Sequence, residues 1–172
     1  YAAAQGVNVT KAAIAGYSAG AHLALLYTYS MAAQSPLPVL FVHSKAGPAD
    51  FRTFSPESAD VQEFMAKMGV GNDEQAVQEL LRNEKVVNMI QTASPVFYVK
   101  RGAVPAILSY GRQDGLVVWE NVVSMLNALD AADVEYTLVE YPNSAHGLDK
   151  DADSAQRSVD AMLDYSKKYF GY

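Results

Sequence analysis

The chain of 172 residues contains no cysteine. Disulfide bonds, thiolate metal ligands and a cysteine nucleophile are therefore excluded together. The sequence also lacks any apolar run close to the roughly 20 residues that a membrane-spanning helix needs. We therefore expect no membrane span, and no residue pattern calls for a metal ion or another cofactor.

Clusters of lysine or arginine are absent as well. The 13 basic residues are outnumbered by 19 acidic residues, which gives a formal net charge of -6, and the acidic side chains are spread along the chain. Proteins that follow a phosphate backbone need basic clusters, so we expect a small-molecule substrate rather than a nucleic-acid partner.

The beginning of the chain shows no targeting segment. Tyr1 is not an initiator methionine, and the residues after it do not form the basic segment of a signal peptide. We expect that the native N-terminus lies upstream of Tyr1 and that the protein is cytoplasmic.

Short apolar runs alternate with amphipathic segments along the chain. The expected strands are 11–15, 38–43, 105–110 and 134–141. Helices follow the first, third and fourth runs, and residues 51–93 form a helical, cap-like insertion. This order predicts an α/β fold with a mostly parallel, doubly wound sheet, right-handed crossovers and helices on both faces. We expect one domain over residues 1–172.

Two of the expected helices have a defined apolar stripe. In the helix after the third strand the inward residues are Val118, Val122, Met125, Leu126 and Leu129. In the last helix, which Asp153 or Ser154 caps, they are Ala155, Val159, Met162, Leu163 and Phe170.

The first pattern with chemical content is Gly16-Tyr17-Ser18-Ala19-Gly20, between an expected strand and an expected helix. A nucleophilic serine needs this context, because a sharp strand-to-helix turn projects the hydroxyl above the sheet. The Ala19 N–H then faces the oxyanion that develops during acyl transfer. A structural reading of the same residues is a turn that merely caps a helix.

Such a serine needs a base, and the chain has three histidines. His22 lies within an expected buried helix and His43 ends an expected strand, so we interpret both as packing or hydrogen-bonding residues. His146 lies in a loop after the last strand, where side chains of a parallel sheet reach a shared site. We predict that His146 is the base.

The base in turn needs a carboxylate that holds its ring in one tautomer. Asp114 follows the third strand within Tyr110-Gly111-Arg112-Gln113-Asp114 and is the predicted acid. Asp50, after the second strand, is the alternative. Asp149, Asp151 and Asp153 are interpreted as residues that solvate the His146 loop and favour the N-terminus of the last helix.

Four segments of the sequence together resemble a family of known enzymes. They are 16–24, 93–96, 110–114 and 143–147, in which the Ser-Ala-Gly turn is followed by Ala-His-Leu-Ala. The chain resembles α/β-hydrolase esterases related to acetyl-xylan and feruloyl esterases and to hormone-sensitive-lipase-like carboxylesterases. This resemblance implies a Ser18-Asp114-His146 triad.

The chain also departs from that family. Members carry four further strands before the nucleophile strand, with a His-Gly-Gly loop that donates a second oxyanion hydrogen bond, and this chain has no His-Gly-Gly. We therefore expect the 172 residues to be the C-terminal part of an enzyme, of low activity alone. The exposed first strand is then expected to pair with a second copy.

The sequence thus predicts a hydrolase of carboxylic esters, with short acyl groups such as acetyl. Two alternatives stay open, namely a prolyl-oligopeptidase-type serine peptidase and a non-catalytic remnant that self-associates. Five aromatic residues are candidates for an acyl pocket: Tyr17, Phe51, Phe54, Phe64 and Trp119. Among them, Tyr17 is the one that we assign to substrate binding.

Overall fold

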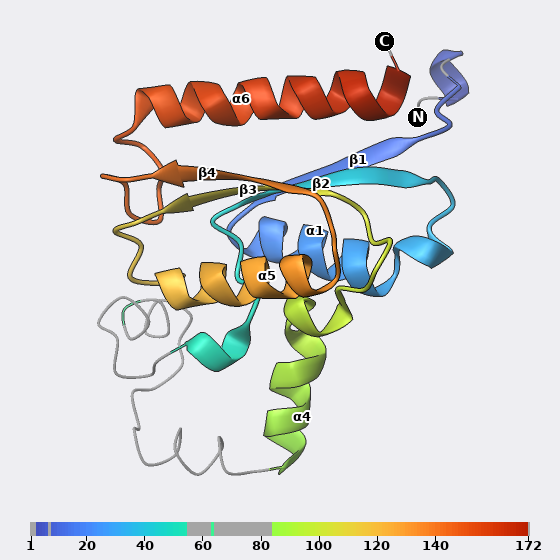
Figure 1. Ribbon diagram of the computed structural model, residues 1–172. Coiled ribbons are helices and arrows are strands. Elements are labelled where there is room, and N and C mark those ends of the chain that lie inside the picture. The colour runs from blue at the N-terminus through green and yellow to red at the C-terminus, as the bar shows by residue number, and fades with distance from the viewer. Residues whose placement is uncertain (1–2, 7, 55–62, 64–83, 172) are drawn as a thin grey trace.

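The computed structural model describes residues 3–6, 8–54, 63 and 84–171 (Figure 1). Most of the predicted insertion, which spans 51–93, lies outside these residues, and so does Phe64. At its two ends the structure shows a 3-10 turn at Phe51–Thr53 and helix α4 at Glu84–Ala93. The insertion as a unit stays a prediction. Within the described ranges, no helix combines the length and the apolar character needed to cross a membrane.

Four parallel strands form one sheet in the order β1-β2-β3-β4. Their bounds are Ala12–Tyr17, Val39–Lys45, Ala106–Gly111 and Tyr136–Tyr141. The register places Tyr17 beside Lys45, Lys45 beside Ser109, and Ser109 beside Val139. The carboxyl ends of the strands therefore meet at one edge of the sheet, as the predicted α/β fold requires. β1 is an edge strand of the described sheet, and its pairing with a second copy stays a prediction.

The three long helices that pack on the sheet cover both of its faces, as predicted. In Figure 1, α1 (Ala19–Ser30) and α5 (Trp119–Ala131) lie on one face and α6 (Ala152–Ser166) lies on the other. Because the described strands are added in one direction, right-handed crossovers place their connecting helices on the same face. α6 follows the last strand and closes the opposite face.

Shorter helical segments lie between these elements or at the two ends of their order. They are 3-10 turns at Ala3–Gln5, Ala32–Gln34 and Pro95–Tyr98, and a π-helical end after α6 at Lys167–Gly171.

Alternate residues of β3 build two separate cores. Leu108 and Tyr110 are fully buried in the larger core, under α1 and α5. Of the predicted stripe of α5, Val122, Met125 and Leu129 are buried there and Leu126 packs against this core, whereas Val118 precedes the helix. Ile107 points to the smaller core under α6. The period-2 alternation of a strand with two covered faces explains this division.

The predicted inward stripe of α6 is wrong at three positions. Ala155 is exposed. Val159 and Leu163 are 40% and 46% exposed, whereas the buried residues of α6 are Ser154, Ser158 and Tyr165. Opposite Ser158 the sheet carries the polar side chains of His43 and Ser109, so a serine rather than a large apolar residue faces it. α6 also begins at Ala152, before the residues that were predicted to cap it.

His43 lies at the centre of this polar contact. Its Nε2 atom is 3.1 Å from Ser158 Oγ and 3.3 Å from Ser109 Oγ, and the two hydroxyls are 3.0 Å apart. Burial, with a smaller contribution from Lys45, lowers the pKa of His43 from 6.5 to about 4. The buried ring is therefore neutral near neutral pH and shares hydrogen bonds with the two hydroxyls through Nε2.

We predict that His43 makes the fold sensitive to mild acid. The unfolded chain protonates His43 near pH 6.5, the folded chain only near pH 4. The free energy of unfolding should therefore fall by roughly 3 kcal/mol as the pH is lowered from 6.5 to 4. Above pH 6.5 His43 is neutral in both states, so it should add no pH dependence. Urea unfolding at several pH values measures it. His43→Gln is the control, and parallel pH curves for the two proteins would contradict the prediction.

Candidate active site

Ser18 occupies a strained turn between β1 and α1. The strand ends at Tyr17 and the helix begins at Ala19, so Ser18 alone makes the turn, with a φ of 53°. Its N–H donates to the Lys45 carbonyl at 2.8 Å, which ties the turn to β2. A side chain at Gly16 would overlap the backbone of Gly20. The first glycine of the pattern is therefore required by the close approach of strand and helix.

His146 brings its imidazole to this serine from the loop that follows β4. Ser18 Oγ lies 2.8 Å from His146 Nε2, and His146 Nδ1 lies 2.8 Å from Asp114 Oδ2. The structure thus brings together the three side chains that the sequence predicts as nucleophile, base and acid. Their catalytic roles stay a prediction.

Asp114 is held in one orientation by the backbone of its own turn. Its side chain is fully buried, and Oδ1 accepts hydrogen bonds from the N–H groups of Leu116 and Val117, both at 2.9 Å. Oδ2 is left to face His146. Since an ionised carboxylate has no proton to donate, Nδ1 of the imidazole carries the proton and Nε2 is the acceptor. This tautomer can receive the hydroxyl proton of Ser18.

The N-terminus of α1 supplies a partial positive charge beside Ser18. Ala19 is the first residue of this 12-residue helix, and N–H groups in the first turn have no acceptor within the helix. The macrodipole adds to the same positive potential. The Ala19 N–H is therefore suited to an oxyanion, in the role that the sequence predicts for it.

Tyr17 holds the histidine loop from the side of the nucleophile. Its hydroxyl donates to the His146 carbonyl at 2.9 Å, and the two rings lie 5.7 Å apart. Burial, followed by the nearby carboxylates of Asp114 and Asp149, raises the pKa of Tyr17, which keeps the hydroxyl protonated. Sequence reasoning missed this contact, because only the fold brings the two residues together. The predicted substrate contact of Tyr17, which is 47% exposed, stays a prediction.

The other two histidines make hydrogen bonds away from this triad. His22 Nδ1 lies 3.0 Å from the Pro48 carbonyl, and its ring packs edge-on against Phe51. His43 is buried under α6, as described above. Both match their interpretation as packing or hydrogen-bonding residues.

Asp50, the alternative acid, is engaged elsewhere. Its carboxylate accepts hydrogen bonds from Arg52 at 2.6 Å and from Ser124 at 2.5 Å. Burial alone would raise its pKa, but these hydrogen bonds and the Arg52 charge hold the pKa below its usual value. The structure therefore gives Asp50 a role in joining the loop after β2 to α5, and pairs Asp114 with the imidazole.

Three of the other predicted pocket aromatics also contact neighbours within the fold. Phe51 and Phe54 rings lie 5.3 Å apart, and the Arg112 guanidinium stacks over Trp119 at 3.5 Å. Among the residues that the structure describes, no three histidine, aspartate or glutamate side chains are grouped to hold a metal ion.

The sequence was compared with models of protein families and matches one described as BD-FAE. The model of the BD-FAE family matches residues 1–129. The chain belongs to the BD-FAE family. The matched residues include Ser18 and Asp114, whereas the His146 loop follows them. No curated protein sequence matches this BD-FAE member.

Solved structures resemble the BD-FAE chain at low sequence identity. A puromycin-hydrolyzing peptidase of Mycobacterium tuberculosis has a TM-score of 0.71 at 20% identity, and the match covers 99% of this chain and 24% of the peptidase. A truncated carbohydrate esterase from gut microbiota has a TM-score of 0.68 at 18% identity, and the match covers 96% of this chain and 63% of the esterase. An esterase of Thermogutta terrifontis has a TM-score of 0.61 at 16% identity, and the match covers 91% of this chain and 55% of that esterase. The shared fold is of the α/β-hydrolase type, and the chain spans less than two thirds of each of these proteins.

We predict that the Tyr17 hydroxyl contributes to the reactivity of Ser18. Tyr17→Phe removes one hydrogen bond to the histidine loop, which is worth about 0.5–1.5 kcal/mol. The rate of Ser18 phosphonylation by a fluorophosphonate should therefore fall by roughly 2- to 12-fold. Tyr27→Phe, which removes a tyrosine hydroxyl from α1, is the matched control. Equal rates for Tyr17→Phe and the parent would show that the contact is not needed.

Proposed function

We propose that this BD-FAE protein is a serine hydrolase that cleaves carboxylic esters through an acyl-enzyme. The observation that carries the proposal is the continuous hydrogen-bond chain from Ser18 Oγ to His146 to Asp114, with both distances at 2.8 Å. A serine in a strained strand-to-helix turn, with an imidazole within hydrogen-bond distance of its hydroxyl, is the arrangement that acyl transfer requires.

In the proposed reaction Ser18 Oγ attacks the ester carbonyl while its proton moves to Nε2 of His146. The Ala19 N–H donates to the negative oxygen of the tetrahedral intermediate. His146 then gives the proton to the leaving alcohol, and an acyl-enzyme remains. Water attacks the acyl group by the same route, with His146 as base and then as acid, and Ser18 is restored.

Short acyl esters, such as acetyl groups carried by a carbohydrate, are the proposed substrates. The Ser-Ala-Gly turn followed by Ala-His-Leu-Ala supports esters, and structural neighbours include a carbohydrate esterase and an esterase. A serine peptidase is the second candidate, because a puromycin-hydrolyzing peptidase and an acylaminoacyl peptidase share the fold.

We predict that the protein hydrolyses p-nitrophenyl acetate faster than a proline p-nitroanilide. Ser18→Ala should remove the ester turnover, because it deletes the attacking oxygen. Ser30→Ala, a change at the other end of α1, is the matched control and should retain it. Faster turnover of the anilide would favour the serine peptidase over the esterase. Ester turnover that survives in Ser18→Ala would contradict the assignment of the nucleophile.

We also predict that Asp114→Asn lowers kcat for the ester by roughly 10⁴ while the chain stays folded. The amide favours the wrong tautomer of the imidazole, as in other serine triads. Asp50→Asn makes the same change of charge at the alternative acid and should cost much less activity, although it weakens the contact with Arg52. Circular dichroism checks the fold of both variants. The opposite ranking of the two losses would assign the acid to Asp50.

A further inference from the structure

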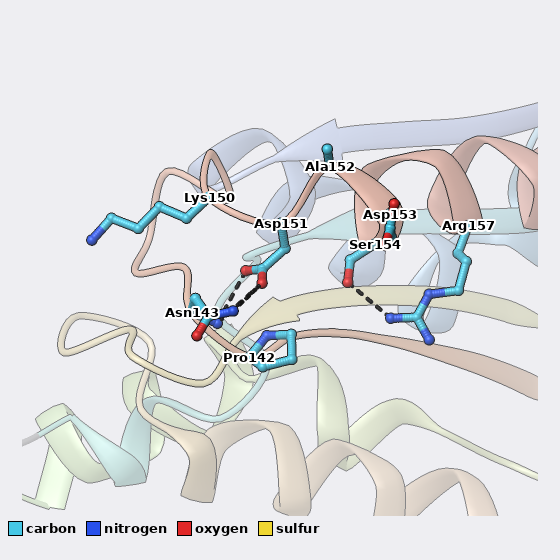
Figure 2. A pocket seen from close by; sticks show the side chains of 8 residues that line it. All are labelled: Pro142, Asn143, Lys150, Asp151, Ala152, Asp153, Ser154 and Arg157. Carbon is cyan, nitrogen blue, oxygen red and sulfur yellow. Dashed lines mark hydrogen bonds between the residues drawn. The ribbon is translucent and has the colours of Figure 1, made fainter.

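The loop that carries His146 is closed into a ring at its base. Asp151, the residue before α6, accepts hydrogen bonds from the Asn143 side chain at 2.8 Å and from its backbone N–H at 3.1 Å. It also accepts the Ser144 hydroxyl at 2.6 Å. Figure 2 shows the Asp151 carboxylate pointing toward Asn143. The nine residues from 143 to 151 are thus joined at their two ends, with His146 between them.

Every group that faces Asp151 within this ring is a donor. A carboxylate has acceptor sites for all three, whereas an asparagine amide would place an NH₂ against a donor. Burial alone would raise the pKa of Asp151, but the hydrogen bonds from Ser144 and Asn143 hold the pKa below its usual value. The ring is therefore closed by an anion near neutral pH.

The ring is also fixed to the rest of the fold at both sides. Ser144 is fully buried, its hydroxyl accepts from the Lys150 N–H at 3.0 Å, and its carbonyl accepts from the Gln113 N–H at 3.0 Å. A side chain at Gly111 would overlap the Ser144 carbonyl. At the other side, Ser154 of α6 donates to the Glu140 carbonyl at 2.8 Å. The segment just before His146 therefore packs against the loop that carries Asp114.

We propose that Asp151 is a positioning residue for the reaction of Ser18, because its carboxylate closes the loop that presents the His146 imidazole. This inference rests on the proposed role of His146 as base, and it replaces the interpretation of Asp151 as a solvating residue. Asp151 itself contacts no reacting atom. It restricts the freedom of a loop in which a displacement of about 1 Å can lower the rate by roughly 10²-fold.

The test compares Asp151→Asn with Asp153→Asn. Asp153 lies two residues further along, is exposed in the first turn of α6, and loses the same charge. Asp151→Asn should lower kcat for p-nitrophenyl acetate by roughly 10- to 100-fold with little change in KM, because the acid, the base and the nucleophile are all kept. Asp153→Asn should leave both values unchanged. Ser144→Ala removes one donor to Asp151 and also the acceptor of the Lys150 N–H. Its loss of kcat and that of Asp151→Asn should therefore combine to less than their sum in the double variant, because both act on the same ring.

A second measurement reports the position of the imidazole without any turnover. Ring ¹⁵N–¹H spectra of the three histidines, with His146 assigned by its loss in His146→Gln, should show shifted or broadened His146 signals in Asp151→Asn. The signals of His22 and His43 should not change. Unchanged His146 signals in Asp151→Asn, or equal effects in Asp153→Asn, would overturn the proposal. If the parent protein shows no ester turnover, the proposed function fails, whereas the ring signals still decide the role of Asp151.

Discussion

Parallel pairing in one register is the constraint on which the site depends. Tyr17, Lys45, Ser109 and Val139 lie in one row across the four strands, so every loop that follows a strand starts at the same edge of the sheet. Ser18 leaves β1 at this edge, Asp114 follows β3 and His146 follows β4. Three side chains that are far apart in sequence therefore meet through hydrogen bonds of 2.8 Å.

The features that sequence predicts well are those with a strong local signal. The short apolar runs and the stripe of α5 follow directly from the 2.0 and 3.6 residue periods. The Gly-Tyr-Ser-Ala-Gly pattern is local too, since the close approach of Gly16 to Gly20 lies within five residues. Asp114 and His146 could be chosen because each follows an expected strand, and only a few aspartates and histidines compete for each role.

What the sequence does not predict depends on long-range contacts. The inward face of α6 is set by His43 and Ser109 on the sheet, and Ser158 has no apolar character that would mark it as buried. The role of Asp151 has the same cause, because three acidic residues lie close together after His146 and only the fold shows which one faces Asn143. The Tyr17 contact joins residues that are 129 positions apart.

The central claim is that Ser18 is the activated serine of this chain because His146 accepts its proton. The most direct test is to label the protein with a fluorophosphonate and to map the adduct by peptide mass spectrometry, in the parent and in His146→Gln. The account predicts a single adduct at Ser18 and a rate of labelling that collapses when the imidazole is removed. An adduct at another serine, or undiminished labelling of Ser18 in His146→Gln, would contradict it.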